Sequence, residues 1–155
     1  MLNSAPFKLW KRLSEVSSFE STTNCRKIPP SYEPRKGRGR VILQDSSMET
    51  ITFFEKGMWR GVQTRQEIAF TNVFRWKLDS ENGGLSLEHL RFGVERPVFL
   101  FSLTPIEEHL FKSLKPHECK EDAYYGSVLF DEHYIHLNWR IIGPKKNEMV
   151  SVVYS

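Results

Sequence analysis

The segment 116–126, PHECKEDAYYG, concentrates side chains that could do chemistry. It contains an imidazole, a thiol, carboxylates and two phenols, and it runs directly into an apolar, β-favouring sequence. Residues two apart in a strand face the same way, so Asp122 and Tyr124 are expected to point inward near one rim of a sheet. His117, Asp122 and Tyr124 could then fix the polar end of a bound molecule. The alternative is structural, with Asp122 satisfying backbone amides where the strand starts and His117 holding a loop in place.

Three other chemistries are conceivable for this part of the chain. His117 and Cys119 could act as base and nucleophile, although residues two apart on an extended segment have no assured hydrogen-bond geometry. Metal binding by His117, Cys119, His133 and His136 matches no established ligand spacing. We therefore assign no catalytic residue, no metal ligand and no cofactor. Acid–base catalysis by the cluster of His117, Asp122 and Tyr124 stays open as an alternative function.

The surrounding sequence predicts a mainly β fold. From Arg38 onward, short β-favouring runs alternate with turn signals such as Asn82-Gly83-Gly84. In the clearest alternation, residues 68–78, Asn72 is the one polar member of an apolar face. Residues 106–114 fit helical spacing better than alternation. About eight to ten strands are expected, and closing them into an antiparallel up-and-down barrel removes their exposed edges.

We expect a single domain over residues 1–155 with three parts. Residues 1–16 carry apolar side chains at helical spacing, which predicts a short amphipathic helix that plugs or flanks one end of the barrel. Residues 17–37 are rich in Ser, Thr, Asn and Pro and are expected to be an irregular, basic connection. Residues 38–155 are expected to form the barrel.

A soluble barrel of this size can enclose one small ligand among apolar rings and a few polar anchors. Gly126 could thin the wall where a ring or a ligand approaches closely. Arg140 could clamp a carboxylate or phosphate inside, or lie outside beside an acidic residue. The leading interpretation is a non-catalytic barrel that binds a small, largely apolar ligand with a polar or acidic end. Its candidate ligand-binding residues are His117, Asp122, Tyr124, Arg140, Trp139, Phe130, Trp76, Phe101 and Asn72.

Composition narrows the class and the compartment. Hydrophobic residues make up 39% of the chain and charged residues 26%, which is typical of a globular domain. No apolar run approaches the roughly 18 residues that a membrane span needs. The N-terminus lacks the layout of a secretory signal, and two cysteines are too few for a disulfide framework. We expect a cytoplasmic protein with reduced thiols; the oligomeric state is not predicted.

The net charge of +3 is unevenly distributed. Residues 1–40 hold nine Lys and Arg against three Glu, so the positive excess lies in the N-terminal region. The basic stretch from Arg26 to Arg40 could bind a phosphate backbone or a protein partner, which is a second alternative function. A solvated loop would explain the same stretch, and no aromatic stacking platform is interleaved with it, so nucleic acid is not the expected partner.

The chain also resembles a known family. The residues that carry the resemblance are Phe54-Glu55-Lys56-Gly57, Phe74-Arg75-Trp76, His117-x-Cys119-x-x-Asp122-x-Tyr124-x-Gly126 and Gly143-Pro144-Lys145-Lys146, ending near Tyr154. This combination is similar to domain-of-unknown-function family 6314 from Phe7 to Tyr154. The resemblance implies a lipocalin-like, calycin-type barrel with a helix near its N-terminus, and it implies no activity. In that pattern a basic residue and a tyrosine often stand where this chain has Asn72 and Phe74.

Overall fold

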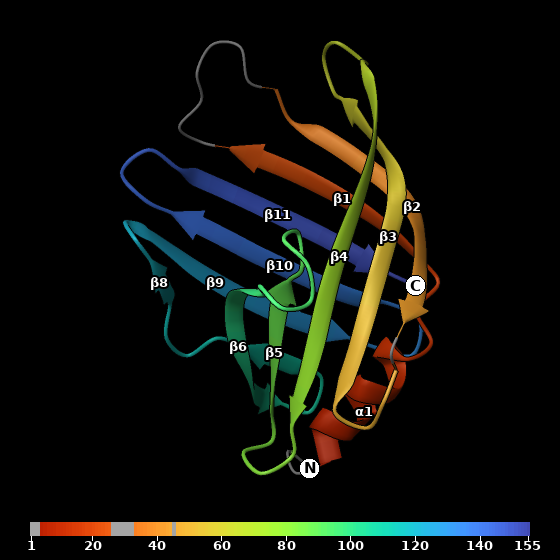
Figure 1. Ribbon diagram of the computed structural model, residues 1–155, viewed down its shortest axis with the longest axis vertical. Coiled ribbons are helices and arrows are strands. Elements are labelled where there is room, and N and C mark those ends of the chain that lie inside the picture. Colours follow the sequence, from red (N-terminus) through yellow and green to blue (C-terminus); the bar gives the residue numbers. More distant parts are fainter. Residues whose placement is uncertain (1–3, 26–32, 45) are drawn as a thin grey trace.

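The computed structural model describes residues 4–25, 33–44 and 46–155. It begins with one helix, α1 (Ala5–Leu13), which is followed by strands throughout (Figure 1). The strands are β1 (Ser18–Cys25), β2 (Arg35–Gln44), β3 (Thr50–Gly61), β4 (Glu67–Asp79), β5 (Gly84–His89), β6 (Val98–Glu107), β7 (Leu110–Lys112), β8 (His117–Cys119), β9 (Asp122–Phe130), β10 (Ile135–Ile142) and β11 (Asn147–Tyr154).

All strand pairs are antiparallel, and most join strands that follow one another in the chain. β11 returns to pair with β1, and β10 pairs with both β9 and β11. These pairings close a barrel of ten strands, and the short β8 is added at the edge of β9. The predicted antiparallel barrel with a short helix near its N-terminus is confirmed.

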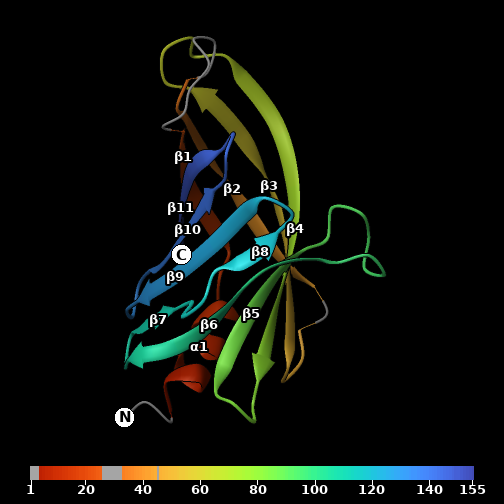
Figure 2. The same cartoon turned by 90° about the vertical axis from the view of Figure 1, so that its left-hand side faces the viewer.

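The half of the barrel beside α1 is filled by side chains, and we call it the closed half. Alternate residues of the strands point inward there, and Ile51, Phe53 and Trp76 are fully buried. Leu9 and Leu13 of α1 are also fully buried, so the helix closes this end of the barrel (Figures 1 and 2). Each such aliphatic side chain contributes about 1.5–3 kcal/mol by leaving water.

The opposite half has an incomplete wall, and we call it the open half. Of the thirteen residues of β4, only Phe74–Asp79 pair with β5. Among the described residues, 67–73 therefore have a strand partner, β3, on one edge only. Across the gap in the wall from residues 67–73 lies β8, which pairs with Asp122–Tyr124 of β9. Figure 1 shows β2, β3 and β4 extending well beyond β5 and β6, and in Figure 2 the connection between β5 and β6 projects away from the barrel.

One expectation about local structure was wrong. Residues 18–25 and 35–37 were expected to be irregular but form β1 and the start of β2. β1 has few strong β formers, and it is held by pairing along both edges, with β11 and with β2. The rest of the expected connection, residues 26–32, lies outside the described residues.

The segment 106–114, which the sequence left open between helix and strand, belongs to a strand hairpin. It contains the end of β6 and the whole of β7. A register shift between Pro105 and Glu107 interrupts the alternation, and a turn at 108–109 separates β6 from β7.

Candidate functional site

A buried carboxyl group lies inside the barrel, between its two halves. Glu55 of β3 is only 3% exposed, and its carboxylate accepts a 2.5 Å hydrogen bond from the hydroxyl of Tyr154 at the end of β11. Tyr154 itself is 1% exposed. Because β1 and β2 separate β3 from β11 in the sheet, this hydrogen bond crosses the interior. Asn72 stands directly opposite Glu55 on β4 and also hydrogen-bonds its side chain.

The surroundings of this carboxyl group raise its pKa to near neutral pH. Burial raises the pKa of Glu55 to about 7, and the hydrogen bonds from Tyr154 and Asn72 only partly oppose that rise. Among the described residues, no Lys, Arg or His forms an ion pair with Glu55. Burial and the neighbouring charge of Glu55 raise the pKa of Tyr154 well above its usual value of 10, so the phenol stays a hydrogen-bond donor.

Aromatic rings face the interior in the open half, beyond the buried carboxyl. The ring of Trp59 lies 4.8 Å from that of Phe70, which in turn contacts Phe19 at 5.9 Å. Ile68, on the same inner face, is 46% exposed, whereas the inner residues of the closed half are buried. The hydroxyl of Ser21 is buried there with no hydrogen-bond partner in the described part of the chain. The open half thus combines apolar walls that solvent reaches with a set of polar groups beneath them. We call these groups, Ser21, Glu55, Asn72 and Tyr154, the polar floor.

Three of the nine residues predicted for the site lie near one another on β8, β9 and β10. The ring of His117 packs edge-on against Phe99 at 4.7 Å and lies 6.2 Å from that of Tyr124, its cross-strand partner. Trp139 is half-buried and contacts Phe74 at 5.7 Å. Tyr124 and Trp139 therefore border the interior beside the incomplete wall, and His117 lies between Tyr124 and the exposed ring of Phe99.

Asp122 and Arg140 make their contacts elsewhere. The carboxylate of Asp122 lies 3.8 Å from the ammonium group of Lys146 and packs against Gly143, so it is engaged at the turn between β10 and β11. Arg140 alternates with the inward-facing Trp139 and lies on the outer face, where it donates a 3.3 Å hydrogen bond to Asn147. The structure does not bring either group to Glu55.

The remaining predicted residues divide between core and site. Trp76, Phe101 and Phe130 are buried in the packed core. Two hollows formed by described residues, one at the β4–β5 hairpin and one over β3 and β4, include none of the nine in their walls. Asn72 is the exception among the candidates, because it lies beside Glu55 and takes part in the polar floor.

Sequence reasoning missed Glu55 and Tyr154 as site residues. A signal was present, since Ile51, Phe53 and Glu55 share one parity of an apolar strand. A single carboxylate at an inward position of such a strand predicts a buried ionisable group. Its partner could not be found in the same way, because Tyr154 stands 99 positions further along the chain.

The thiol and the other histidines do not assemble into a metal site. Cys119 is exposed on β8, and the rings of His133 and His136 both contact Tyr134. No group of three or more His, Cys, Asp or Glu suited to a metal ion occurs in the part of the chain that the structure describes. Within the same part, no helix has the length and apolar character to cross a membrane.

Fold and site together define a closed antiparallel β-barrel that holds a carboxyl–phenol pair in its interior. The model of the family of unknown function DUF6314 matches residues 23–155, and the chain belongs to this family. Among curated proteins, none matches it in sequence.

Two solved barrels resemble the fold. One is a redesigned β-barrel, mFAP1, bound to DFHBI, at 8% identity and a TM-score of 0.43 over 89% of this chain and 92% of that one. The other is EF1p2_mFAP2b bound to DFHBI, at 9% identity and a TM-score of 0.43 over 99% of this chain and 98% of that one. At these values the likeness carries no argument about function.

Proposed function

We propose that this protein binds a small, largely apolar ligand in the open half of the barrel, with the polar end of the ligand at Glu55, Asn72 and Tyr154. One observation carries the proposal: a carboxyl group is buried without a cation beneath aromatic side chains that solvent still reaches. Burying such a group is costly, so a barrel built for stability alone would place an apolar side chain there. Perturbed ionisable groups of this kind concentrate at functional sites.

The polar floor favours a ligand end that donates hydrogen bonds. An acidic end would meet the charge of Glu55, and like charges at close range disfavour each other. Arg140, the predicted clamp for an acidic end, lies on the outer face. A hydroxyl, amide or amine would instead satisfy Glu55 and the buried hydroxyl of Ser21. Trp59 and Phe70 would stack on a planar apolar body.

An enzyme that transfers protons is the second candidate, and one observation favours it. A carboxyl group with a pKa of about 7 is well placed to act as a general acid or base at neutral pH. In that case Glu55 is the group that moves the proton, because Asp122 is engaged with Lys146.

Two probe dyes test the binding proposal. The uncharged dye Nile red is expected to bind the full chain with increased fluorescence. The anionic dye 1-anilinonaphthalene-8-sulfonate is expected to bind about tenfold more weakly at pH 8, where Glu55 is ionised. Trp59→Ala should weaken Nile red binding by about tenfold. Tyr125→Ala, which removes an exposed ring of the outer face, should leave it unchanged.

Equal losses in the two variants, or no binding of Nile red, would overturn the proposal. Native mass spectrometry of freshly purified protein separates the two candidate functions. The molecule to follow is the one that the purified protein retains. If this molecule stays chemically unchanged when it is incubated with the protein, the result supports binding. Its conversion, abolished in Glu55→Gln, supports the enzyme.

A further inference from the structure

The outer face of the β2–β3 hairpin carries a second feature, made of cations. Gly37, Gly39 and Val41 of β2 face the interior, so Lys36, Arg38 and Arg40 point outward, and all three are exposed. On β3 the outward positions next to them include Lys56 and Arg60, which are exposed as well. We call these five side chains, Lys36, Arg38, Arg40, Lys56 and Arg60, the basic face.

The register places like charges opposite each other on this face. Lys36 pairs with Arg60, and Arg40 pairs with Lys56. Like charges directly across an antiparallel pair are destabilising, so fold stability does not explain this arrangement.

Among the described residues, an acidic neighbour pairs with only one cation of the basic face. Arg60 forms a 2.5 Å ion pair with Glu67 of β4. Glu20 stands opposite Arg38 on β1, and no ion pair joins them. Within the described residues, Lys36, Arg38, Arg40 and Lys56 have no acidic partner in ion-pairing distance. Four cations are thus available to an anionic partner.

An apolar hollow of about 410 Å³ adjoins the basic face. It lies over the paired strands β3 and β4, where the outward side chains of Ala69 and Thr71 are small and exposed. Its lining residues are Lys56, Gly57, Met58, Ala69, Phe70 and Thr71. Lys56 belongs to both features, so a ligand held by the cations reaches the hollow directly.

We propose that the basic face binds the phosphate backbone of a single-stranded nucleic acid, with one base in the hollow beside Met58. Cations on one face of a strand recur about every 6.7 Å, at twice the rise per residue, so the row on β2 spans about 13 Å. Arginines, which make up three of the five, bind phosphate oxygens in a bidentate manner. A flexible single-stranded nucleic acid can follow the convex outer face of the barrel, whereas a flat membrane would contact only its most protruding residues.

The basic stretch of the sequence belongs in part to the sheet. Residues 35–40 are not part of a solvated loop but of β2, and β3 contributes two further cations to the same face. Arg26 and Lys27 lie outside the described residues and play no part in the proposal.

Fluorescence anisotropy with a labelled twelve-nucleotide oligouridylate and the full chain tests the proposal. If four to five phosphates are neutralised, the logarithm of the binding constant should fall against log salt with a slope of about −3. The double variant Arg38→Gln/Lys56→Gln should lose about tenfold or more in affinity at low salt. Its slope against log salt should be less negative by about 1.4. Lys36→Gln/Arg40→Gln should give the same result.

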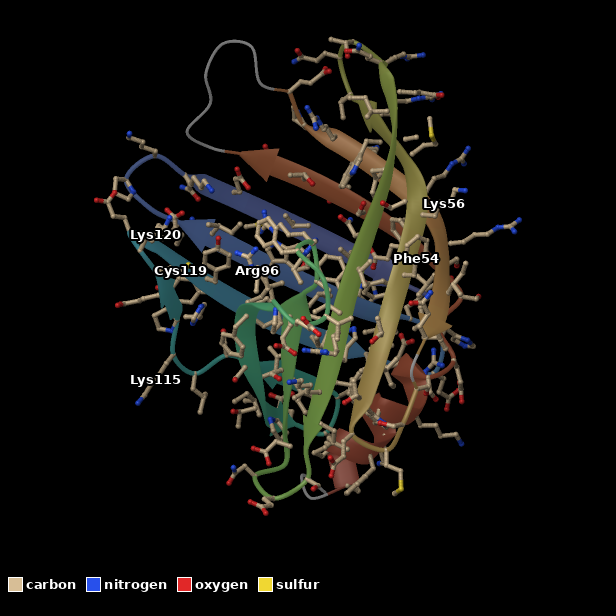
Figure 3. All side chains as sticks on the ribbon, in the orientation of Figure 1. Phe54, Lys56, Arg96, Lys115, Cys119 and Lys120 are labelled. Atoms are coloured by element: carbon tan, nitrogen blue, oxygen red, sulfur yellow. The ribbon has the colours of Figure 1, made fainter. Side chains whose placement is uncertain are left out.

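The matched control is Lys115→Gln/Lys120→Gln, which removes the same charge from exposed positions at β8. Figure 3 shows Lys115 and Lys120 on the opposite side of the barrel from Lys56. The control should change the affinity by less than about twofold. Equal losses in the control and in either test variant would overturn the proposal. Tighter binding to phosphatidylserine vesicles than to the oligonucleotide would also overturn it. Circular dichroism should show that all three variants fold.

Discussion

Glu55 and Tyr154 join opposite parts of the barrel through one hydrogen bond between buried side chains. The bond gives the phenol an acceptor and the carboxyl group a donor, so neither group is buried without a partner. It does not remove the cost of ionising Glu55 away from water, which is why burial still raises the pKa of that carboxyl group to about 7. The interior therefore carries a group whose charge changes close to physiological pH.

Stability should depend on pH through Glu55. Its pKa is about 7 in the folded protein, above the ordinary value of 4.5, so the folded state holds the proton more tightly. The stabilisation from this proton is complete below about pH 4.5 and is lost as the pH rises through about 7. The free energy of unfolding of the wild type, relative to Glu55→Gln, should therefore fall by about 2 kcal/mol between pH 5 and pH 8.

Urea unfolding at the two pH values measures this difference. Glu20→Gln, which changes an exposed carboxyl group on the outer face of β1, gives the background dependence on pH. A difference between wild type and Glu55→Gln that stays constant with pH would show that Glu55 does not titrate in this range.

At the scale of the element, β9 is shaped by the absence of a side chain at Gly126. The ring of Phe101 from β6 packs directly on this glycine, and a Cβ atom there would lie 2.4 Å from the ring. Phe101 also contacts Trp139 at 6.3 Å, so Gly126 lets β6 pack against β9 and β10 together. The sequence predicted a close approach at Gly126, and the structure shows that the approaching group is this core ring.

Gly126→Ala should destabilise the protein by about 1–3 kcal/mol, because Phe101 is buried and has little room to move. Thermal unfolding measures the effect. Ser127→Ala, at the next position and on the other face of β9, should change stability by less than about 0.5 kcal/mol. Adding Phe101→Leu to Gly126→Ala should restore part of the loss, and failure of that rescue would argue against the ring as the cause.

At the scale of the whole molecule, the barrel is closed by hydrogen bonds on every side only in its closed half. Residues 74–77 of β4 pair with strands on both edges, whereas 67–73 have a strand partner on one edge only. Backbone amides without a neighbouring strand exchange with solvent more readily. One continuous strand therefore crosses from a fully paired wall to an exposed edge, beside the proposed ligand site.

Hydrogen exchange followed by mass spectrometry should resolve the two halves of β4. Peptides covering 67–73 should exchange faster than those covering 74–77. In β3, whose residues 52–60 pair with both β2 and β4, the corresponding halves should differ much less. Equal protection along β4 would contradict the incomplete wall.

Part of the candidate site could be anticipated from the sequence and part could not. The alternation of residues 68–78 identified Asn72 as a polar side chain on an apolar face, and it lies on the polar floor. The segment around His117 and Tyr124 does border the interior. Asp122 was expected beside them, but its contacts with Lys146 and Gly143 depend on how the β10–β11 turn packs against the start of β9.

The fold class was determined by the sequence itself. Alternation of apolar and polar residues and turn signals are local patterns, and enough of them occur in this chain to specify an antiparallel barrel with a short helix. Only the tertiary structure decided which distant residues meet, such as Glu55 with Tyr154 and the cations of β2 with those of β3. It also decided that residues 18–25 are a strand, because that segment is held by its neighbours and not by its own propensity. The pairing of β1 with β11 joins segments near the two ends of the chain, so it leaves no local pattern in the sequence.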